Sequence, residues 1–282
     1  SEKKYQTTVP GERIIVPGKD TELIFGKTAL TNTTVPNKWG KYKDIAFRND
    51  GSFILTYAND EDPEELRMQL FNNDGTKLGS EITISDNHAE DQSIGVFSDN
   101  SIVVAYSLYT ASPQHSDLYF QMFNADGTKA IDETGVKLSS STLTDGPVLR
   151  VAPNDQFIIV YADKSSSSSN HIHDIMFKRY LKDGTFIGGE TTVYTDKHSY
   201  GALVEYFSDN SFIIVWKTSP TSSFGGAYYQ LYTADGMKNG NAVAFTDCGS
   251  SIKPVIFSDD SYGFVCYEPS RDAADAVNNE DE

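Results

Sequence analysis

The sequence lacks most of the features that would identify a membrane protein, a metal-rich site or a common enzyme class. Its 282 residues include only 2 cysteines, 4 methionines and 5 histidines. No apolar run reaches the roughly eighteen residues of a membrane-spanning helix, so we expect no membrane insertion. Also absent are the Gly-x-Ser-x-Gly elbow, the His-Glu-x-x-His helix, the P-loop and the dinucleotide-binding fingerprint. No short motif therefore identifies a catalytic chemistry.

Positive charge is scarce as well. Lysine and arginine number 23 against 40 aspartates and glutamates, which gives a formal net charge of −17. Nucleic acid binding needs a concentrated cationic face, so we expect no nucleic acid partner. Part of the acidic excess falls in residues 268–282, which lack any apolar period and which we interpret as a disordered tail. The two cysteines, Cys248 and Cys266, leave open both a disulfide and a pair of buried thiols.

Aromatic residues, by contrast, are plentiful and recur at a fixed spacing. An apolar run ending in an aromatic follows an Asp/Asn-rich turn, and four such runs precede an aromatic placed three residues before an Asp-Gly pair. A repeat of about fifty residues is typical of an array in which each unit packs against its neighbours. The runs are Phe53 to Tyr57, Ile102 to Tyr106, Phe157 to Tyr161, Phe212 to Trp216 and Tyr262 to Tyr267.

Each repeat divides into four short strands, which we call A to D. In the first full unit they are residues 43–48, 52–58, 65–71 and 78–85. Strand B is a continuous apolar run, which predicts burial on both faces, whereas strand C alternates between polar and apolar positions. Asp-Gly between C and D is a strong hairpin signal. A sheet with doubly buried inner strands and half-polar outer strands is typical of a propeller blade.

Counting strands predicts an all-β, five-bladed β-propeller with four antiparallel strands per blade. The C-terminus supplies only strands A and B of the last blade, and the N-terminus supplies its C and D, which leaves no free sheet edge. We therefore assign a single domain to residues 1–267. Its predicted blades are residues 43–85, 92–139, 147–195 and 202–246, and a composite of 252–267 with 13–32.

The repeat resembles a degenerate repeat of large secreted bacterial calcium-binding and adhesin-like proteins. The resemblance covers roughly residues 40 to 267. It implies propeller blades, an extracellular or cell-surface location and calcium as a candidate ligand, and it carries over no catalytic residue. The residues themselves indicate no cofactor. The best-matching positions are Ser52, Phe53, Ile54, Tyr57, Gln69, Phe71, Asn72, Asp74, Gly75, Thr76 and Gly79.

The loops that join B to C and D to A differ among the repeats, while the A-to-B and C-to-D turns are alike. Loops on a rigid scaffold usually carry recognition, so we expect the ligand site on the variable rim. Aromatic platforms near amides and carboxylates suit a sugar, whose ring has one apolar face. Capping of the blade ends by the same rings is the alternative. The candidate ligand-binding residues are Trp39, Tyr42, Tyr109, Tyr200 and Phe224.

Metal binding has weaker support. His171, His173 and Asp174 are closely spaced donors on the variable rim. Polar residues gather in loops for other reasons, however, so we predict no metal site. Asn32, in Asn32-Thr33-Thr34, is the glycosylation candidate.

One position near the end of strand A should line the central channel. In the five blades it holds Ile45, Gly95, Arg150, Glu205 and Val255. Arg150 and Glu205 fall in adjacent blades, and we interpret them as a structural ion pair rather than a catalytic pair. A glycosidase would need carboxylates reaching the channel from different blades, and strand A offers only Glu205 and Asp44.

The preferred hypothesis is a non-catalytic extracellular binding or adhesion module whose partner is a carbohydrate or a surface protein. A structural subunit that polymerises by exchanging its N-terminal half-blade is one alternative, so the chain would be a monomer or a strand-exchanged polymer. A glycoside-active propeller enzyme is the other alternative.

Overall fold

The structure is a computed structural model in which the regular structure consists of β-strands. Within the described residues no helix occurs, and none is therefore long and apolar enough to cross a membrane. The described residues are 13–14, 23–24, 43–58, 65–111, 114–131, 135–138, 144–163, 174–195, 198–219, 226–245 and 252–266.

Four antiparallel sheets of four strands follow one another along the chain, which confirms the predicted all-β class and the four-strand unit. A two-stranded sheet precedes them and another follows them. The first pair is β1 (Arg13–Ile14) and β2 (Leu23–Ile24), and the last is β19 (Ile252–Ile256) and β20 (Tyr262–Cys266). The four-stranded sheets are β3 (Lys43–Phe47), β4 (Phe53–Ala58), β5 (Leu66–Phe71) and β6 (Lys77–Ser85); β7 (Ala89–Val96), β8 (Ile102–Ala111), β9 (Gln114–Phe123) and β10 (Val136–Lys137); β11 (Thr144–Val151), β12 (Phe157–Asp163), β13 (Asp174–Tyr180) and β14 (Phe186–Tyr194); and β15 (His198–Tyr206), β16 (Phe212–Ser219), β17 (Ala227–Tyr232) and β18 (Lys238–Phe245).

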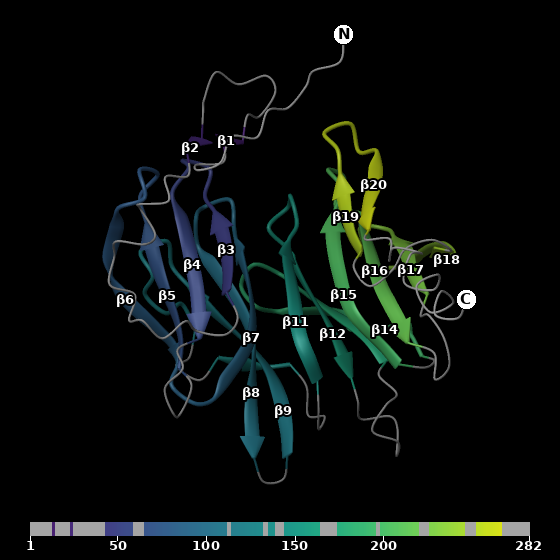
Figure 1. The fold of residues 1–282 in the computed structure, drawn as a ribbon, viewed down its shortest axis with the longest axis horizontal. Helices are drawn as coiled ribbons and strands as arrows, with labels where there is room; N and C mark the ends of the chain where they lie inside the picture. The colour runs from purple at the N-terminus through teal and green to yellow at the C-terminus, as the bar shows by residue number, and fades with distance from the viewer. Residues whose placement is uncertain are drawn as a thin grey trace, which may run out of the picture.

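The sheets pack face to face around their first strands, as the blades of a propeller do. β3 contacts β7, β7 contacts β11, β11 contacts β15 and β15 contacts β19, so the A strands are neighbours at the centre. Figure 1 shows this succession from β3 to β19. The arrangement is therefore β-propeller-like, and the A strands surround the region where a channel site would lie.

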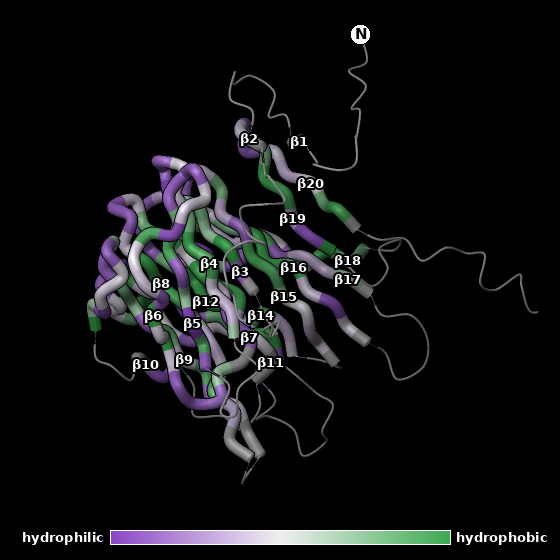
Figure 2. The backbone as a smooth tube through the Cα atoms, turned by 60° about the vertical axis from the view of Figure 1, so that its left-hand side comes forward, coloured by the Kyte–Doolittle hydropathy of each residue, from purple (hydrophilic) through white to green (hydrophobic). Residues whose placement is uncertain are grey.

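Burial of the B strands explains why the blades stack. Ile102 to Tyr106, Phe157 to Tyr161 and Phe212 to Trp216 are each at most 2% exposed, because each strand has a sheet on either side. Hydrophobic clusters fill the spaces between successive blades, and Figure 2 shows hydrophobic segments gathered inside the stack. β4 departs from the pattern, since Phe53 and Leu55 are only half-buried. The described residues cover one face of this first blade and not the other.

A hydrogen bond between neighbouring A-to-B turns ties the blades together, and we call it the turn clasp. An Asp or Asn at positive φ in one turn accepts a backbone N–H from the preceding blade's turn. The first blade has Gly51 at the equivalent position, and glycine has no side chain to accept such a bond. The clasps join Ser98 N to Asp155 Oδ1 at 2.8 Å, Asn154 N to Asn210 Oδ1 at 3.0 Å and Ser208 N to Asp260 Oδ1 at 2.9 Å.

The chain ends differ from the predicted closure. Residues 13–14 pair with 23–24 inside the predicted half-blade 13–32, but no ladder joins β1 or β2 to β20 in the described residues. Cys266 pairs with Ile252 in the β19–β20 ladder, and Cys248 lies outside the described residues. The predicted tail, 268–282, lies outside them as well.

Candidate functional site

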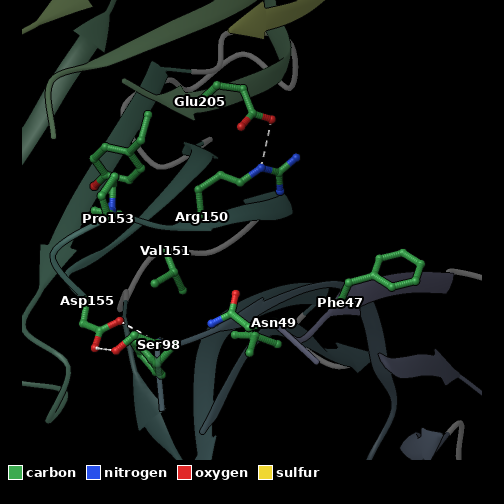
Figure 3. Close-up of a pocket in the computed structure, with 12 residues that line it drawn as sticks. Phe47, Asn49, Ser98, Arg150, Val151, Pro153, Asp155 and Glu205 are labelled. Atoms are coloured by element: carbon green, nitrogen blue, oxygen red, sulfur yellow. Dashed lines mark hydrogen bonds and ion pairs between the residues drawn. The ribbon is translucent and has the colours of Figure 1, made fainter. Parts of the chain in front are cut away.

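A hollow of about 360 Å³ lies at the centre of the fold, where the A strands run into their A-to-B turns. Four blades contribute to it through β3, β7, β11 and β15. Apolar walls and a few charged groups meet there, as is typical of small-molecule sites. Its lining residues, drawn in Figure 3, are Phe47, Asn49, Val96, Phe97, Ser98, Arg150, Val151, Ala152, Pro153, Asp155, Glu205 and Tyr206.

Arg150 and Glu205 form the charged pair of this hollow, and they come from adjacent blades. Arg150 Nε donates to Glu205 Oε1 at 3.0 Å, and Arg150 Nη1 donates to the Leu149 carbonyl at 2.8 Å. The two side chains are 37% and 34% exposed, so both reach the hollow (Figure 3). The other guanidinium N–H groups find no acceptor among the described residues. A donor and a carboxylate therefore stand side by side with hydrogen-bonding capacity left for a ligand.

The ladder corrects the predicted register of the first blade by one residue. Phe47 pairs with Phe53 as Val151 pairs with Phe157, so Ala46, and not Ile45, is the equivalent of Arg150 and Glu205. Arg48 then occupies the place that Phe97 and Phe207 take in other blades, so the aromatic pattern of the first blade is shifted by one residue.

Asp44 has a structural role rather than a place in the hollow. Its Oδ1 accepts the Ile45 N–H at 2.9 Å, and its Oδ2 accepts the Ile94 N–H of the next blade at 3.0 Å. Ser93 Oγ makes the equivalent bond to Leu149 N at 3.1 Å. Each bond satisfies a donor on the open inner edge of an A strand.

Asp155, the second carboxylate of the hollow, is held by its neighbours. Ser98 donates to it through its N–H and its Oγ, and Lys182 Nζ lies 3.1 Å away. Burial alone would raise the pKa of Asp155, but the hydrogen bonds from Ser98 and Lys182 outweigh burial and leave the pKa below its usual value. Glu205 is thus the carboxylate of the hollow that is not part of a turn clasp.

Tyr206 and Phe47 supply the aromatic surface of the hollow. Burial raises the pKa of Tyr206, so its phenol stays protonated at neutral pH. Phe47 is 49% exposed although it is fully apolar, and it lies at the end of β3 that faces the hollow. An apolar ring beside charged groups suits a sugar, which presents both kinds of surface.

Two of the five predicted ligand-binding residues, Tyr109 and Tyr200, fall within the described residues. The structure sets Tyr109 half-buried within β8 and Tyr200 39% exposed on β15, and Asp174 begins β13. Among the described residues no group of three His, Cys, Asp or Glu side chains is arranged to hold a metal. Trp39, Tyr42, Phe224, His171, His173 and Asn32 lie outside the described residues.

The hollow opens among the A-to-B turns and not on the variable rim where we expected the ligand. Ser98, Pro153 and Asp155 belong to those turns, and their likeness to other repeats hid them in the sequence. The one feature of the sequence that pointed to this hollow was the pair of opposite charges, Arg150 and Glu205, at equivalent positions of adjacent blades. The connection from strand B to strand C of the second blade, which we expected to be a variable loop, is also largely strand, because β8 and β9 pair as far as Ala111 and Gln114.

Solved structures share this fold. The chain matches a family 93 glycoside hydrolase, an α-L-arabinofuranosidase of Fusarium graminearum solved with arabinobiose, with a TM-score of 0.59 and 14% identity over 81% of this chain and 75% of that one. A mutant α-L-arabinofuranosidase from the same fungus, solved with an iminosugar inhibitor, matches with a TM-score of 0.60 and 13% identity over 82% and 76%. No protein-family model and no curated protein matches the sequence. At these identities the likeness establishes the fold alone.

The likenesses correct two predictions. The predicted non-catalytic binding or adhesion module and the predicted lack of enzymatic activity are both contradicted by the comparisons, because the two matched structures are glycoside hydrolases. The error came from the absence of short catalytic motifs. An active site at the centre of a propeller collects single residues from several blades, so it leaves no such motif.

Proposed function

We propose that this protein is a glycoside-active enzyme that binds a carbohydrate in the central hollow. The observation that carries the proposal is Glu205, a part-exposed carboxylate fixed by Arg150 where the inner strands of four blades converge. The likeness in fold to an α-L-arabinofuranosidase supports the same assignment. A carbohydrate is accordingly the proposed partner.

We assign Glu205 as the anionic carboxylate that takes part in cleavage of the glycosidic bond. Such a group stabilises the positively charged transition state, or activates water, beside the sugar's anomeric carbon. Arg150 orients it through the 3.0 Å hydrogen bond to Oε1, and Oε2 accepts no hydrogen bond from the described residues. Hydrolysis by a carboxyl pair also needs an acid, and Asp155 is committed to its turn clasp. The assignment to Glu205 therefore covers the base or nucleophile alone.

The proposal is tested by release of reducing sugar from a panel of arabinans, xylans and other polysaccharides. Wild type should turn over at least one of them, and Glu205→Gln should lower kcat by at least about a hundredfold. Glu65→Gln is the matched control, because Glu65 also pairs with an arginine, Arg67, but lies outside the hollow. Equal losses in both variants would contradict a role for Glu205 in the reaction.

We also propose that the ring is closed as five blades, with the β1–β2 hairpin as strands C and D of the last blade. Several surfaces beside that place are uncovered: Val265 is 64% exposed, Phe257 53% and Ile45 42%, and β18 is exposed along nearly its whole length. The hairpin already pairs antiparallel. The connection formed by residues 25–42 can span roughly 60 Å when extended, which is ample for docking on β20.

An extracellular or cell-surface setting remains a prediction, as do the resemblance to calcium-binding and adhesin-like repeats and calcium itself as a ligand. The acidic composition, −17 in formal charge, is compatible with a neutral polysaccharide substrate and unfavourable for a polyanionic one.

A further inference from the structure

Arg150 has more hydrogen-bonding capacity than its pairing with Glu205 uses. A guanidinium carries five N–H donors. Nε gives one to Glu205 Oε1 at 3.0 Å and Nη1 gives one to the Leu149 carbonyl at 2.8 Å, so three of the five have no acceptor among the described residues. The side chain lines the hollow and is 37% exposed, so these donors are open to a ligand there.

Asn49 brings a second unused hydrogen-bonding group to the same hollow, from the turn between β3 and β4. Its side chain is exposed, lines the hollow and makes no hydrogen bond with the described residues. The turn is formed without it, because Arg48 N donates to the Ser52 carbonyl at 2.8 Å and Gly51 N donates to the Arg48 carbonyl at 3.0 Å. Figure 3 shows Arg150 and Asn49 entering the hollow from different blades. An amide that the fold does not use is available to a ligand.

The charges around the hollow favour a neutral ligand over an anionic one. Two carboxylates, Glu205 and Asp155, and one guanidinium, Arg150, line it. Lys182 Nζ does not offset the second carboxylate alone, since it lies 3.1 Å from Asp155 and 2.9 Å from Asp99. A ligand carboxylate would therefore meet an excess of negative charge. A hydroxyl oxygen accepts from a guanidinium or an amide without that repulsion, and the hydroxyl hydrogen can be donated to Glu205 Oε2.

We propose that Arg150 and Asn49 determine the specificity of the hollow by binding unsubstituted hydroxyls of a neutral sugar unit. This inference rests on the proposed function and adds the substrate class to it. The planar guanidinium fork of Arg150 donates to two adjacent hydroxyl oxygens. Asn49 binds another hydroxyl from the side of the first blade. A site built on such hydrogen bonds rejects a sugar that lacks one of the hydroxyls, because its donors are then left unpaired.

The test measures affinity separately from turnover. Xylobiose, arabinobiose, forms of each that lack one ring hydroxyl, and a galacturonic acid dimer are titrated calorimetrically into full-length Glu205→Gln protein, whose new amide oxygen can still accept from Arg150 Nε. We expect one neutral disaccharide to bind about tenfold more tightly than its deoxy forms, and the acidic dimer to bind most weakly.

Arg150→Lys and Asn49→Ala are then added separately to the Glu205→Gln protein. Arg150→Lys keeps the positive charge but loses the fork, and Asn49→Ala removes no hydrogen bond of the folded protein. Each should weaken binding of the preferred disaccharide about tenfold and leave unchanged the affinity for the deoxy form that lacks its own hydroxyl partner. A merely structural role would weaken both ligands equally.

Matched controls come from polar residues outside the hollow. Asn73→Ala changes an exposed asparagine in the C-to-D turn of the first blade, and Arg67→Lys changes an arginine that pairs with Glu65. Neither should alter the affinity for any of these ligands. A loss in the controls as large as in Arg150→Lys and Asn49→Ala would overturn the specificity role.

The remaining outcomes separate this inference from the proposed function. Equal affinity for the disaccharides and their deoxy forms overturns the specificity role, even if wild type turns over polysaccharide. Tighter binding of the galacturonic acid dimer than of the neutral disaccharides also overturns it, as does absence of binding by all of these ligands. Hydroxyl-dependent binding that needs Arg150 and Asn49, in a protein whose wild type has no turnover, supports the inference and contradicts the proposed function.

Discussion

At the scale of single residues, the side chain at one repeated position of the A strands determines which blades place a charge in the hollow. Ala46, Gly95, Arg150 and Glu205 are equivalent in the ladders, yet only the last two carry charge. Gly95 is small because the next blade lies against it. The absence of a side chain there brings β11 close, and so positions Arg150 for its partner.

Gly95→Ala should destabilise the protein by about 1–3 kcal/mol, because the added Cβ would come within 2.5 Å of Leu149 Cδ2 and 2.6 Å of Val151 Cγ2. Urea unfolding followed by tyrosine and tryptophan fluorescence measures the change. Gly189→Ala is the control, since a Cβ there meets nothing within 4 Å. Similar unfolding curves for the two variants would show that β11 does not pack closely on Gly95.

At the scale of elements, strands and turns were predicted well from the sequence and their spatial connections were not. Asp-Gly pairs and Asx turns fix hairpins locally, so β3 to β6 begin and end close to the predicted residues. The strands β7, β11 and β15 each carry a β-bulge. These bulges were not predicted, because a bulge depends on the partner strand as well as on the local sequence. The turn clasps escaped it because they join residues some fifty positions apart in different blades.

The clasp at Asp155 should make stability depend on acid pH. Hydrogen bonding to Lys182 and Ser101 lowers the pKa of Asp99 to about 2, and Ser98 and Lys182 lower that of Asp155 against the effect of burial. Because both pKa values are lower in the folded protein, the ionised carboxylates contribute their full stabilisation above the aspartate pKa of the unfolded chain, which is near 4. That contribution is lost as the pH falls toward 2. The free energy of unfolding should therefore decline across that window.

Urea unfolding at several pH values between 7 and 2 measures this decline. Asp155→Asn should fold at neutral pH, because Asn210 makes the same clasp with an amide, and should lose stability less steeply in acid. A variant as acid-sensitive as wild type would place the dependence elsewhere, among the other aspartates with lowered pKa values.

At the scale of the whole molecule, the two ends of the array decide whether the propeller is a ring. The sequence predicts that the last blade has only strands A and B and that residues 13–32 supply its other two strands. The structure provides the β1–β2 hairpin and the uncovered surfaces near β19 and β20 but no ladder between them. Gly51 cannot accept a turn clasp from the last blade, so closure would depend on strand pairing at β20.

If β1 pairs with β20, backbone amides of Tyr262 to Cys266 that face away from β19 should be protected from hydrogen exchange. Ile14→Pro removes a donor from β1 and should speed their exchange, while Thr7→Pro, outside the predicted half-blade, should not. Mass measurement in dilute solution should give a monomer. Rapid exchange of those amides in wild type would contradict closure.

The central claim is that Glu205, fixed by Arg150 in the hollow of a propeller-like fold, acts on a glycosidic bond. The most direct measurement is kcat on the best polysaccharide of the panel for wild type, Glu205→Gln and Glu65→Gln. We predict a loss of at least about a hundredfold in kcat for Glu205→Gln alone, with folding intact. Wild-type turnover in Glu205→Gln, or none by wild type on the whole panel, would contradict the claim.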